Sequence, residues 1–455
     1  MPVYRRTFLS RVPALTAGLA AAVRRESYAM LSPNETVNVA VVGIRGGNEG
    51  KPVWTSRGRG QDHYASLSAL PNVRITHVVD VDERHFSTTL PHLKQQWGGD
   101  PKTEIDIRRV LDDPDVDAIT IATPDHWHAL MTIWACQAGK DVYVEKPVSH
   151  NVREGRKMVE AARTYKRVVA AGTQRRSQLL TKQAVEFING GGLGKLHTGR
   201  CSVFGARDPI GTTSDDAPPQ GVHYDLWLGP APARPFNENR FHYTWHWFWD
   251  YGTSELGNNG IHVLDSLRWL MDRREHPRVV FSTGGLYERG EPTDQETPNT
   301  QYTTFQYADG VVLHCDVRGW FTEPSDAGLY VYGTEGWMRI TDGKVSVHLG
   351  RKNEPGPRIG SDEEDEGAGG SAPARRDRHM ENFIDCVRSR KWQDLNAEIL
   401  EGHMSTSLCH LGNISYRLRR SVAFDSTRER FVGDAEADAL LSRVYRPPFV
   451  IPSTV

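Results

Sequence analysis

Glu145 and Lys146 place a carboxylate and an ammonium side by side, directly before Pro147. They follow a short apolar alternation, 141–144, which is typical of a β-strand that gives way to a loop. Catalytic groups often lie at such points, because the sheet fixes the backbone while the loop frees the side chain. The spacing therefore predicts a catalytic lysine. The alternative is a Glu-Lys pair that only closes a strand end.

The stretch 245–265 combines aromatic rings, glycines and polar side chains. On a helix, Asn258, His262 and Asp265 share one stripe, opposite an apolar face that packs into the core. The polar stripe is either a solvated face or one wall of a site. Glycine lets a ligand approach the backbone and aromatic rings stack on sugar faces, which favours a site. The candidate substrate contacts here are Trp247, Trp249, Asn258, Asn259 and His262.

A glycine-rich turn follows the apolar run 37–42, which is expected to be a parallel strand buried on both faces. A helix is expected next, and a dinucleotide would place its pyrophosphate at that helix N-terminus. Two of the three glycine positions of the G-x-G-x-x-G fingerprint are missing, so the turn alone is a weak signal. Its candidate cofactor contacts are Gly43, Arg45, Gly46 and Gly47.

An acidic pair closes the second predicted strand, 73–79. Asp80 or Asp82 then falls where a carboxylate accepts hydrogen bonds from the adenosine ribose hydroxyls. The same negative charge repels a ribose phosphate. We therefore expect NAD as the cofactor, with NADP disfavoured.

The elements around these groups predict an α/β chain of two parts. Strands and helices alternate up to about Gly172, which is typical of a doubly wound parallel Rossmann sheet. Beyond it, short strands are separated by glycine-containing turns and predict an open, mainly antiparallel sheet in an α+β domain. The expected division is a signal at 1–30, a nucleotide-binding domain at 35–172, a substrate and oligomerisation domain at 173–420 with a mobile acidic loop at 353–376, and a tail at 421–455.

Charge and cysteine usage narrow the range of partners. Lys and Arg number 55 against 57 for Asp and Glu, so the net charge of -2 provides no field suited to nucleic acid. A small, neutral or modestly charged substrate fits better. The five cysteines are scattered, and the histidine pairs 126/128 and 242/246 lack the further ligands of a closed zinc shell. We therefore predict neither a disulfide framework nor a metal site.

The N-terminus departs from globular composition. Arg5 and Arg6 precede a short alanine-rich apolar run, 12–23, and small residues follow at 27–29. The run is too short to span a bilayer comfortably, and the twin arginine resembles a signal that exports folded proteins. We expect recognition by the twin-arginine machinery and a periplasmic or otherwise exported protein that is free of the membrane after processing. The alternative is a basic disordered tail.

Several of these segments together resemble the Gfo/Idh/MocA family of glucose-fructose and inositol-type oxidoreductases. The resemblance rests on Glu145-Lys146-Pro147 after a dinucleotide fold and on the segment 257–265. Segments 123–128, 172–174 and 332–336 also look like family segments, and the likeness runs from about Val37 to Arg419.

The resemblance implies catalytic roles for Lys146, Asn258 and His262. Lys146 would orient the reacting hydroxyl and touch the cofactor, and His262 would take the proton as hydride leaves for the nicotinamide. Glu145 would pair with Lys146 and keep it charged. Many family members carry an aspartate where Asn258 stands, so a second carboxylate base is lost here. By resemblance, further cofactor contacts are Thr123, Pro124, His126, Trp127, His128, Glu145 and Gln174. Arg175 and Arg176 stand where the second domain begins and are candidates to reach substrate; the alternative for both is ordinary surface charge.

Three functions compete for this site. The first is an NAD-dependent oxidoreductase that acts on a hydroxyl of a sugar, sugar derivative or glycoside with a tightly bound cofactor. The second uses the same groups for redox-neutral glycoside hydrolysis, in which oxidation permits elimination and hydration before the hydride returns. The third is a non-catalytic sugar-binding protein. Retention of Glu145-Lys146-Pro147 favours plain oxidoreduction. A homodimer or homotetramer through the sheet of the second domain is expected from the resemblance.

Overall fold

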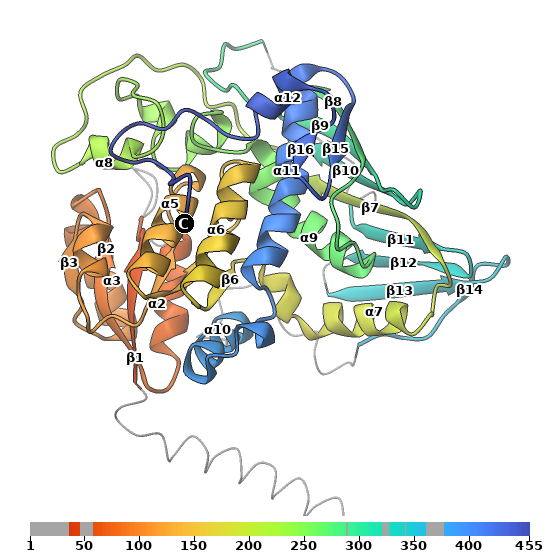
Figure 1. The fold of residues 1–455 in the computed structure, drawn as a ribbon, viewed down its shortest axis with the longest axis horizontal. Helices are drawn as coiled ribbons and strands as arrows, with labels where there is room; N and C mark the ends of the chain where they lie inside the picture. Colours follow the sequence, from red (N-terminus) through yellow and green to blue (C-terminus); the bar gives the residue numbers. More distant parts are fainter. Residues whose placement is uncertain (1–35, 46–57, 288–289, 321–326, 342, 361–376) are drawn as a thin grey trace, which may run out of the picture.

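The computed structural model describes residues 36–45, 58–287, 290–320, 327–341, 343–360 and 377–455 (Figure 1). The twin-arginine segment, Gly46, Gly47 and most of the acidic stretch 353–376 lie outside the described residues. No helix within the described ranges is both long enough and apolar enough to cross a membrane.

The first sheet is parallel and has the strand order β3-β2-β1-β4-β5-β6. Its strands are β1 (Val37–Val42), β2 (Val73–Val79), β3 (Lys102–Glu104), β4 (Ala118–Ile121), β5 (Asp141–Val144) and β6 (Val169–Ala171). The helices between them are α2 (Arg59–Ser68), α3 (Arg84–Trp97), α4 (Ile107–Leu111), α5 (Asp125–Gln137) and α6 (Val152–Thr164). The order reverses between β1 and β4, so a cleft opens at their carboxyl ends. The predicted doubly wound sheet is confirmed.

The second sheet is mixed and mostly antiparallel, as predicted, with only the β7–β10 pair parallel among its described pairings. Alternate residues of β9 and β10 are buried, which matches a sheet covered on one face. Its strands are β7 (Leu196–Phe204), β8 (Val279–Gly285), β9 (Thr300–Gln306), β10 (Val312–Arg318), β11 (Leu329–Gly333), β12 (Gly336–Thr341), β13 (Lys344–Leu349), β14 (Glu354–Pro355), β15 (Val422–Asp425) and β16 (Arg430–Phe431). The stretch expected to be a tail therefore contributes two strands, and the start of the acidic stretch contributes β14.

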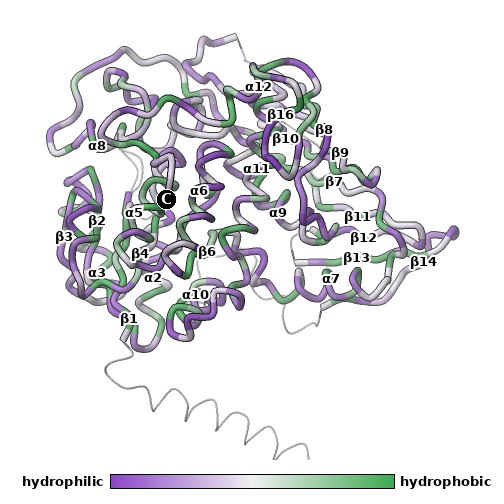
Figure 2. Tube along the Cα trace, in the orientation of Figure 1, coloured by the Kyte–Doolittle hydropathy of each residue, from purple (hydrophilic) through white to green (hydrophobic). Residues whose placement is uncertain are grey.

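Helices α9 (Ile261–Leu270) and α11 (Ile399–Leu418) cover the inner face of the second sheet. Figure 1 shows α11 running between the two domains, where it packs against α6 on one side and against β8 and α9 on the other. The remaining helices are α7 (Leu179–Asn189), α8 (Tyr224–Leu228), α10 (Arg378–Ser389) and α12 (Ala435–Ala439). Figure 2 shows hydrophilic segments toward the outer edges, for example around β14.

A buried ion pair anchors the segment that follows the first domain to helix α9. Arg176, just beyond the first domain, donates through Nε to both carboxylate oxygens of Asp265 on α9, at 3.0 and 2.9 Å. Ser405 of α11 donates to the same carboxylate at 2.7 Å. The exposed fractions of the two charged side chains are 4% and 0%. Asp265 therefore belongs to a buried joint between the segment 174–177, α9 and α11 rather than to a solvated stripe, and Arg176 is used in this joint.

Asp265→Asn is expected to lower the free energy of unfolding by up to about 3–5 kcal/mol, because it removes the buried countercharge of Arg176 and leaves only Glu401, which lies 3.1 Å from Arg176 and is 38% exposed. Asp272→Asn is the matched control: its pair with Arg274 is exposed by 59% and 87%, and pairs of this kind contribute about 0–1 kcal/mol. Urea unfolding of the two variants beside wild type measures the difference. Equal midpoints for all three proteins would show that the joint does not depend on this pair.

Candidate active site

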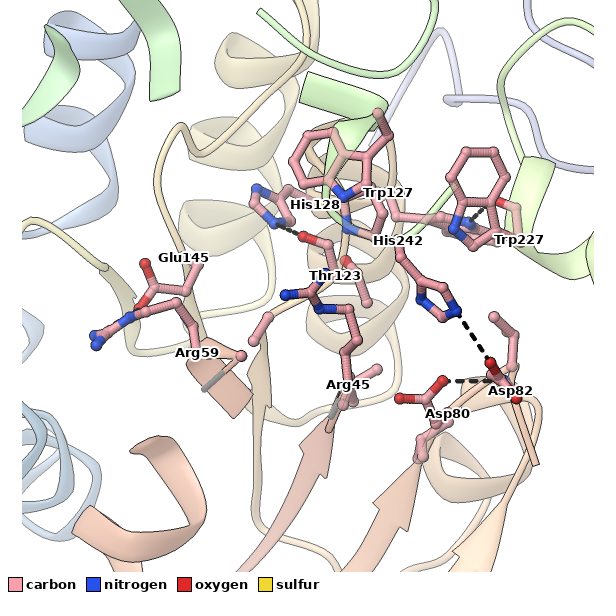
Figure 3. A pocket seen from close by; sticks show the side chains of 18 of the residues that line it. Arg45, Arg59, Asp80, Asp82, Thr123, Trp127, His128, Glu145, Trp227 and His242 are labelled. Carbon is pink, nitrogen blue, oxygen red and sulfur yellow. Dashed lines mark hydrogen bonds and ion pairs between the residues drawn. The ribbon is translucent and has the colours of Figure 1, made fainter. Parts of the chain in front are cut away.

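A cavity of about 340 Å³ lies at the carboxyl ends of the first sheet, beneath a segment of the second domain (Figure 3). Trp227, Phe241 and Tyr243 belong to this covering segment, which we define as 205–255. Polar and glycine residues that line the cavity include Gly43, Arg45, Gly58, Arg59, Asp80, Asp82, Thr123, Asp125, His128, Glu145, Lys146, His242, His246 and Asn258. The cavity therefore unites the predicted cofactor residues with Lys146 and Asn258.

The glycines at one end form a cradle that side chains would fill. Gly43 has φ +86°, and a Cβ there would lie 2.7 Å from the carbonyl oxygen of Ala122. A Cβ on Gly60 would lie 1.7 Å from the carbonyl oxygen of Gly43, so α2 begins directly against β1. Among the described residues no side chain caps the N-terminus of α2 at Gly58, and the N–H of Gln61 donates to the Gly58 carbonyl oxygen at 3.0 Å. The helix N-terminus therefore suits an anionic ligand. These features fit a dinucleotide pyrophosphate. Gly58 and Gly60 were missed because the fingerprint was sought directly after the strand.

The two acids after β2 have different environments. Asp80 lines the cavity and accepts hydrogen bonds from the backbone N–H groups of Ile44 at 2.9 Å and Asp82 at 3.0 Å. The Asp82 carboxylate is bound by Arg84 through Nε at 2.8 Å and Nη2 at 2.7 Å. Burial raises the pKa of Asp82, but hydrogen bonds from Arg84 and His242 outweigh it and lower the pKa below its ordinary value. Asp82 is thus engaged by protein groups, and Asp80 is the better placed to meet a ribose.

Glu145 faces α2 rather than Lys146. Its Oε1 accepts hydrogen bonds from Arg59 Nε at 3.1 Å, His63 Nε2 at 3.0 Å and Gln174 Nε2 at 3.1 Å. Burial raises the pKa of Glu145, yet the charges of Arg59 and His63 bring it well below 4.5. The expected pairing of the Glu145 and Lys146 side chains is replaced by this network, because successive side chains at a strand end point to opposite faces.

Lys146 reaches across to the second domain. Its Nζ donates to the backbone carbonyl oxygen of Asn258 at 2.7 Å and lies 3.4 Å from Asn258 Oδ1. Asn258 belongs to a π-helical turn, Leu256–Gly260, that leads into α9. Such turns occur frequently at functional sites. Burial lowers the pKa of Lys146, while the charges of Glu145 and Asp125 raise it.

His262 lies one helical turn beyond Asn258, at the start of α9. Burial lowers its pKa well below 6.5, and the positive charges of Lys146 and Arg175 lower it further. Arg175 therefore lies within electrostatic range of His262. His262 is not among the residues that line the cavity, but it lies within electrostatic range of Lys146. A neutral imidazole in that position can accept a proton from a hydroxyl that the ammonium orients.

The β4–α5 turn is clamped by its aromatic and histidine side chains. His128 is held between the carbonyl oxygens of Thr123 at 2.8 Å and Pro147 at 2.6 Å. His126 and Trp127 both donate to the carbonyl oxygen of Trp227 at 2.9 Å. Pro124 and Trp127 line the cavity, and His126 lies behind it as a link to the covering segment.

Other predicted site residues lie outside the cavity wall. Trp247 is buried in an aromatic cluster of the covering segment, and Trp249 lies under Arg417. Trp245 and His246 line the cavity in their place. Asn259 donates to Glu255 at 2.5 Å, and Gln174 donates to Glu145 and Tyr143. The side-chain directions of an irregular segment are set by its packing and could not be read from residue types.

Two groups of potential metal ligands occur among the described residues, Asp82/His85/His242 and His276/His403/Glu429. In each, an arginine contacts both oxygens of the carboxylate: Arg84 at Asp82, and Arg156 at Glu429. Both histidines of the second group donate to Glu429 at 2.8 Å. The contacts are those of hydrogen-bonded clusters.

Profiles of known protein families match both domains of this chain. The profile of the oxidoreductase family with an NAD-binding Rossmann fold, Gfo/Idh/MocA, matches residues 37–173. The profile of that family's C-terminal α/β domain matches 211–338 and 371–451. The two profiles thus follow the two domains of the fold.

Curated relatives are distant, and most align over a limited length. A levoglucosan dehydrogenase of Pseudarthrobacter phenanthrenivorans is 26% identical over 183 residues, which is 39% of each chain. The uncharacterized oxidoreductase YrbE of Bacillus subtilis is 28% identical over 61% of this chain and 69% of its own. Glycosyl hydrolase family 109 protein 1 of Shewanella sp. strain ANA-3 is 28% identical over 35% of this chain and 37% of its own.

Solved structures share the fold over most of the chain. A levoglucosan dehydrogenase in complex with NADH and levoglucosan has a TM-score of 0.63 at 17% identity, over 86% of this chain and 99% of that one. The aldose-aldose oxidoreductase of Caulobacter crescentus has a TM-score of 0.59 at 18% identity, over 86% of this chain and all of that one. With both domain profiles matched and the fold shared, the chain belongs to the Gfo/Idh/MocA oxidoreductase family.

Proposed function

We propose that this protein is an NAD-dependent oxidoreductase that removes hydride from a hydroxyl-bearing carbon of a sugar, sugar derivative or glycoside. The observation that carries the proposal is the position of Lys146, which lines the cofactor cavity and contacts Asn258 one turn before a neutral His262. The names of several relatives and neighbours, which include dehydrogenases of levoglucosan, support a carbohydrate substrate.

The described residues fit a dinucleotide. Gly43, Gly58 and the start of α2 would hold the pyrophosphate, and Asp80 would accept hydrogen bonds from the adenosine ribose. A bound nicotinamide supplies the hydride acceptor. The carboxylate of Asp80 favours NAD over NADP by repelling a ribose phosphate.

The protein groups divide the remaining work. Lys146 donates a hydrogen bond to the reacting hydroxyl, which orients it and stabilises negative charge as the proton leaves. His262 accepts that proton, because its lowered pKa keeps the imidazole neutral at pH 7. Asn258 holds Lys146 at the cavity edge.

The covering segment supports a tightly held cofactor. His223 donates its N–H to the Val81 carbonyl at 2.8 Å, and Glu83 donates to that of Gly221 at 2.9 Å, so the segment is fastened beside the ribose position. Release of a dinucleotide would require these two hydrogen bonds to break and the covering segment to move away. A retained cofactor suits export in the folded state, which we propose from the twin-arginine segment. An intact N-terminus on cytoplasmic protein from native cells would contradict export.

Redox-neutral glycoside hydrolysis is the second candidate. It is favoured by the matches to glycosyl hydrolase family 109 proteins of Shewanella. The same Lys146 and His262 would act at an oxidised carbon, where the neighbouring C–H becomes acidic. Net oxidation of substrate separates the first proposal from this one.

Asp80→Asn is expected to raise the Kd for NADH roughly tenfold or more, since a hydrogen bond to a charged group contributes about 1.5–3 kcal/mol. Discrimination against NADPH should shrink as well, because the repelling charge is gone. Fluorescence titration with both nucleotides measures the two effects, and Asp112→Asn, an exposed residue after α4, is the control. Unchanged affinities would remove Asp80 from the ribose site.

His262→Asn is expected to lower kcat by about 10²–10⁴-fold, the usual contribution of a positioned base, while NADH binding is retained. In wild type the acid limb of the pH–rate profile should lie below 6.5, because the lowered pKa preserves the neutral imidazole at lower pH. Steady-state rates across pH check both points, with the exposed His197→Asn as control. A midpoint at or above 6.5, or an active variant, would assign the base elsewhere.

A further inference from the structure

Glu255 is a buried carboxylate that the proposed mechanism does not use. It lies three residues before Asn258, at the start of the π-helical turn, and is 6% exposed. Its Oε2 accepts a hydrogen bond from Asn258 Nδ2 at 3.1 Å, and its Oε1 accepts one from Asn259 Nδ2 at 2.5 Å. One carboxylate therefore binds both asparagines of the turn.

This contact determines which way the Asn258 amide points. A carboxylate only accepts hydrogen bonds, so the amide nitrogen must face Glu255. The amide oxygen then faces Lys146, whose ammonium only donates and lies 3.4 Å from it. Glu255 and Lys146 therefore favour the same orientation of the Asn258 amide.

Arg207 supplies the countercharge for Glu255 and links it to the covering segment. Its Nη2 lies 2.9 and 3.2 Å from the two carboxylate oxygens. Its Nη1 donates to the hydroxyl of Tyr243 at 2.9 Å, and Tyr243 lines the cavity. A continuous set of polar contacts therefore runs from the cavity cover through Glu255 and Asn258 to Lys146.

We propose that Glu255 is a positioning residue for catalysis, which holds the Asn258 amide with Oδ1 toward Lys146 and supplies, from three residues away, the carboxylate that position 258 lacks. The inference rests on the proposed function of Lys146. It deepens that function by assigning a role in placing Lys146 to a carboxylate that does not touch substrate.

The charge of Glu255 also acts on the lysine itself. Burial lowers the pKa of Lys146, and Glu255 is among the carboxylates that raise it again, after Glu145 and Asp125. Loss of the Glu255 charge should therefore favour the neutral amine, which orients a hydroxyl less strongly.

The test exchanges the carboxylate of position 255 and the amide of position 258. Glu255→Gln, Asn258→Asp and the double variant are compared with wild type and with Glu296→Gln, a carboxylate paired with Arg234 at 3.0 Å outside the cavity. Two quantities are measured for each protein: kcat with a sugar substrate, and the pH midpoint of Lys146 acetylation by acetic anhydride, read by mass spectrometry. The acetylation midpoint needs no turnover. It therefore tests the effect of Glu255 on Lys146 even if the protein does not catalyse the proposed reaction. Thermal melts verify folding.

Glu255→Gln is expected to lower kcat about tenfold or more through misplacement of Lys146, and to move the acetylation midpoint to lower pH. Asn258→Asp should also lower kcat, because two carboxylates then meet without a donor between them. The double variant should recover most of the kcat and the wild-type midpoint, since one amide and one carboxylate again face each other. A wild-type midpoint in Glu255→Gln, or a double variant no better than Asn258→Asp, would overturn the proposal.

Discussion

The hydrogen bond from Lys146 Nζ to the Asn258 carbonyl, 2.7 Å long, is the contact on which the site depends. It joins the end of β5 in the first domain to the π-helical turn of the second. Neither domain alone contains both the cofactor cradle and His262. The active site therefore exists only while the domains keep their relative position, which α11 maintains by packing against α6 of the first domain and against α9 and β8 of the second.

Three carboxylates in or beside the cavity have their own arginines: Glu145 pairs with Arg59, Asp82 with Arg84, and Glu255 with Arg207. The pairing lets charged groups stay ionised at low exposure, because each guanidinium offsets the cost of burial. It also limits the net field over the cavity. A neutral sugar hydroxyl suits such a site better than a highly charged substrate.

Local patterns predicted much of the fold. The apolar runs before Gly43, Asp80 and Thr123 gave the parallel strands, because strands buried on both faces have a distinctive sequence. Partners that depend on tertiary packing could not be predicted. Glu145 binds α2 rather than its neighbour Lys146, and Asp265 is buried against Arg176 although it shares a helix with His262. The cradle at Gly58 and the contacts of Glu255 with Asn258 and Arg207 became visible only once the chain was folded.

The most direct test is incubation of the pure protein with sugars and aryl glycosides in deuterated water, without added NAD. Product masses and the oxidation state of the bound cofactor are measured together. Oxidoreduction predicts NADH formed once per site and an intact keto-sugar. The enzyme should turn over further only when a second acceptor is supplied to reoxidise the cofactor. A cleaved glycoside that carries deuterium, with no lasting NADH, would contradict it and establish redox-neutral hydrolysis.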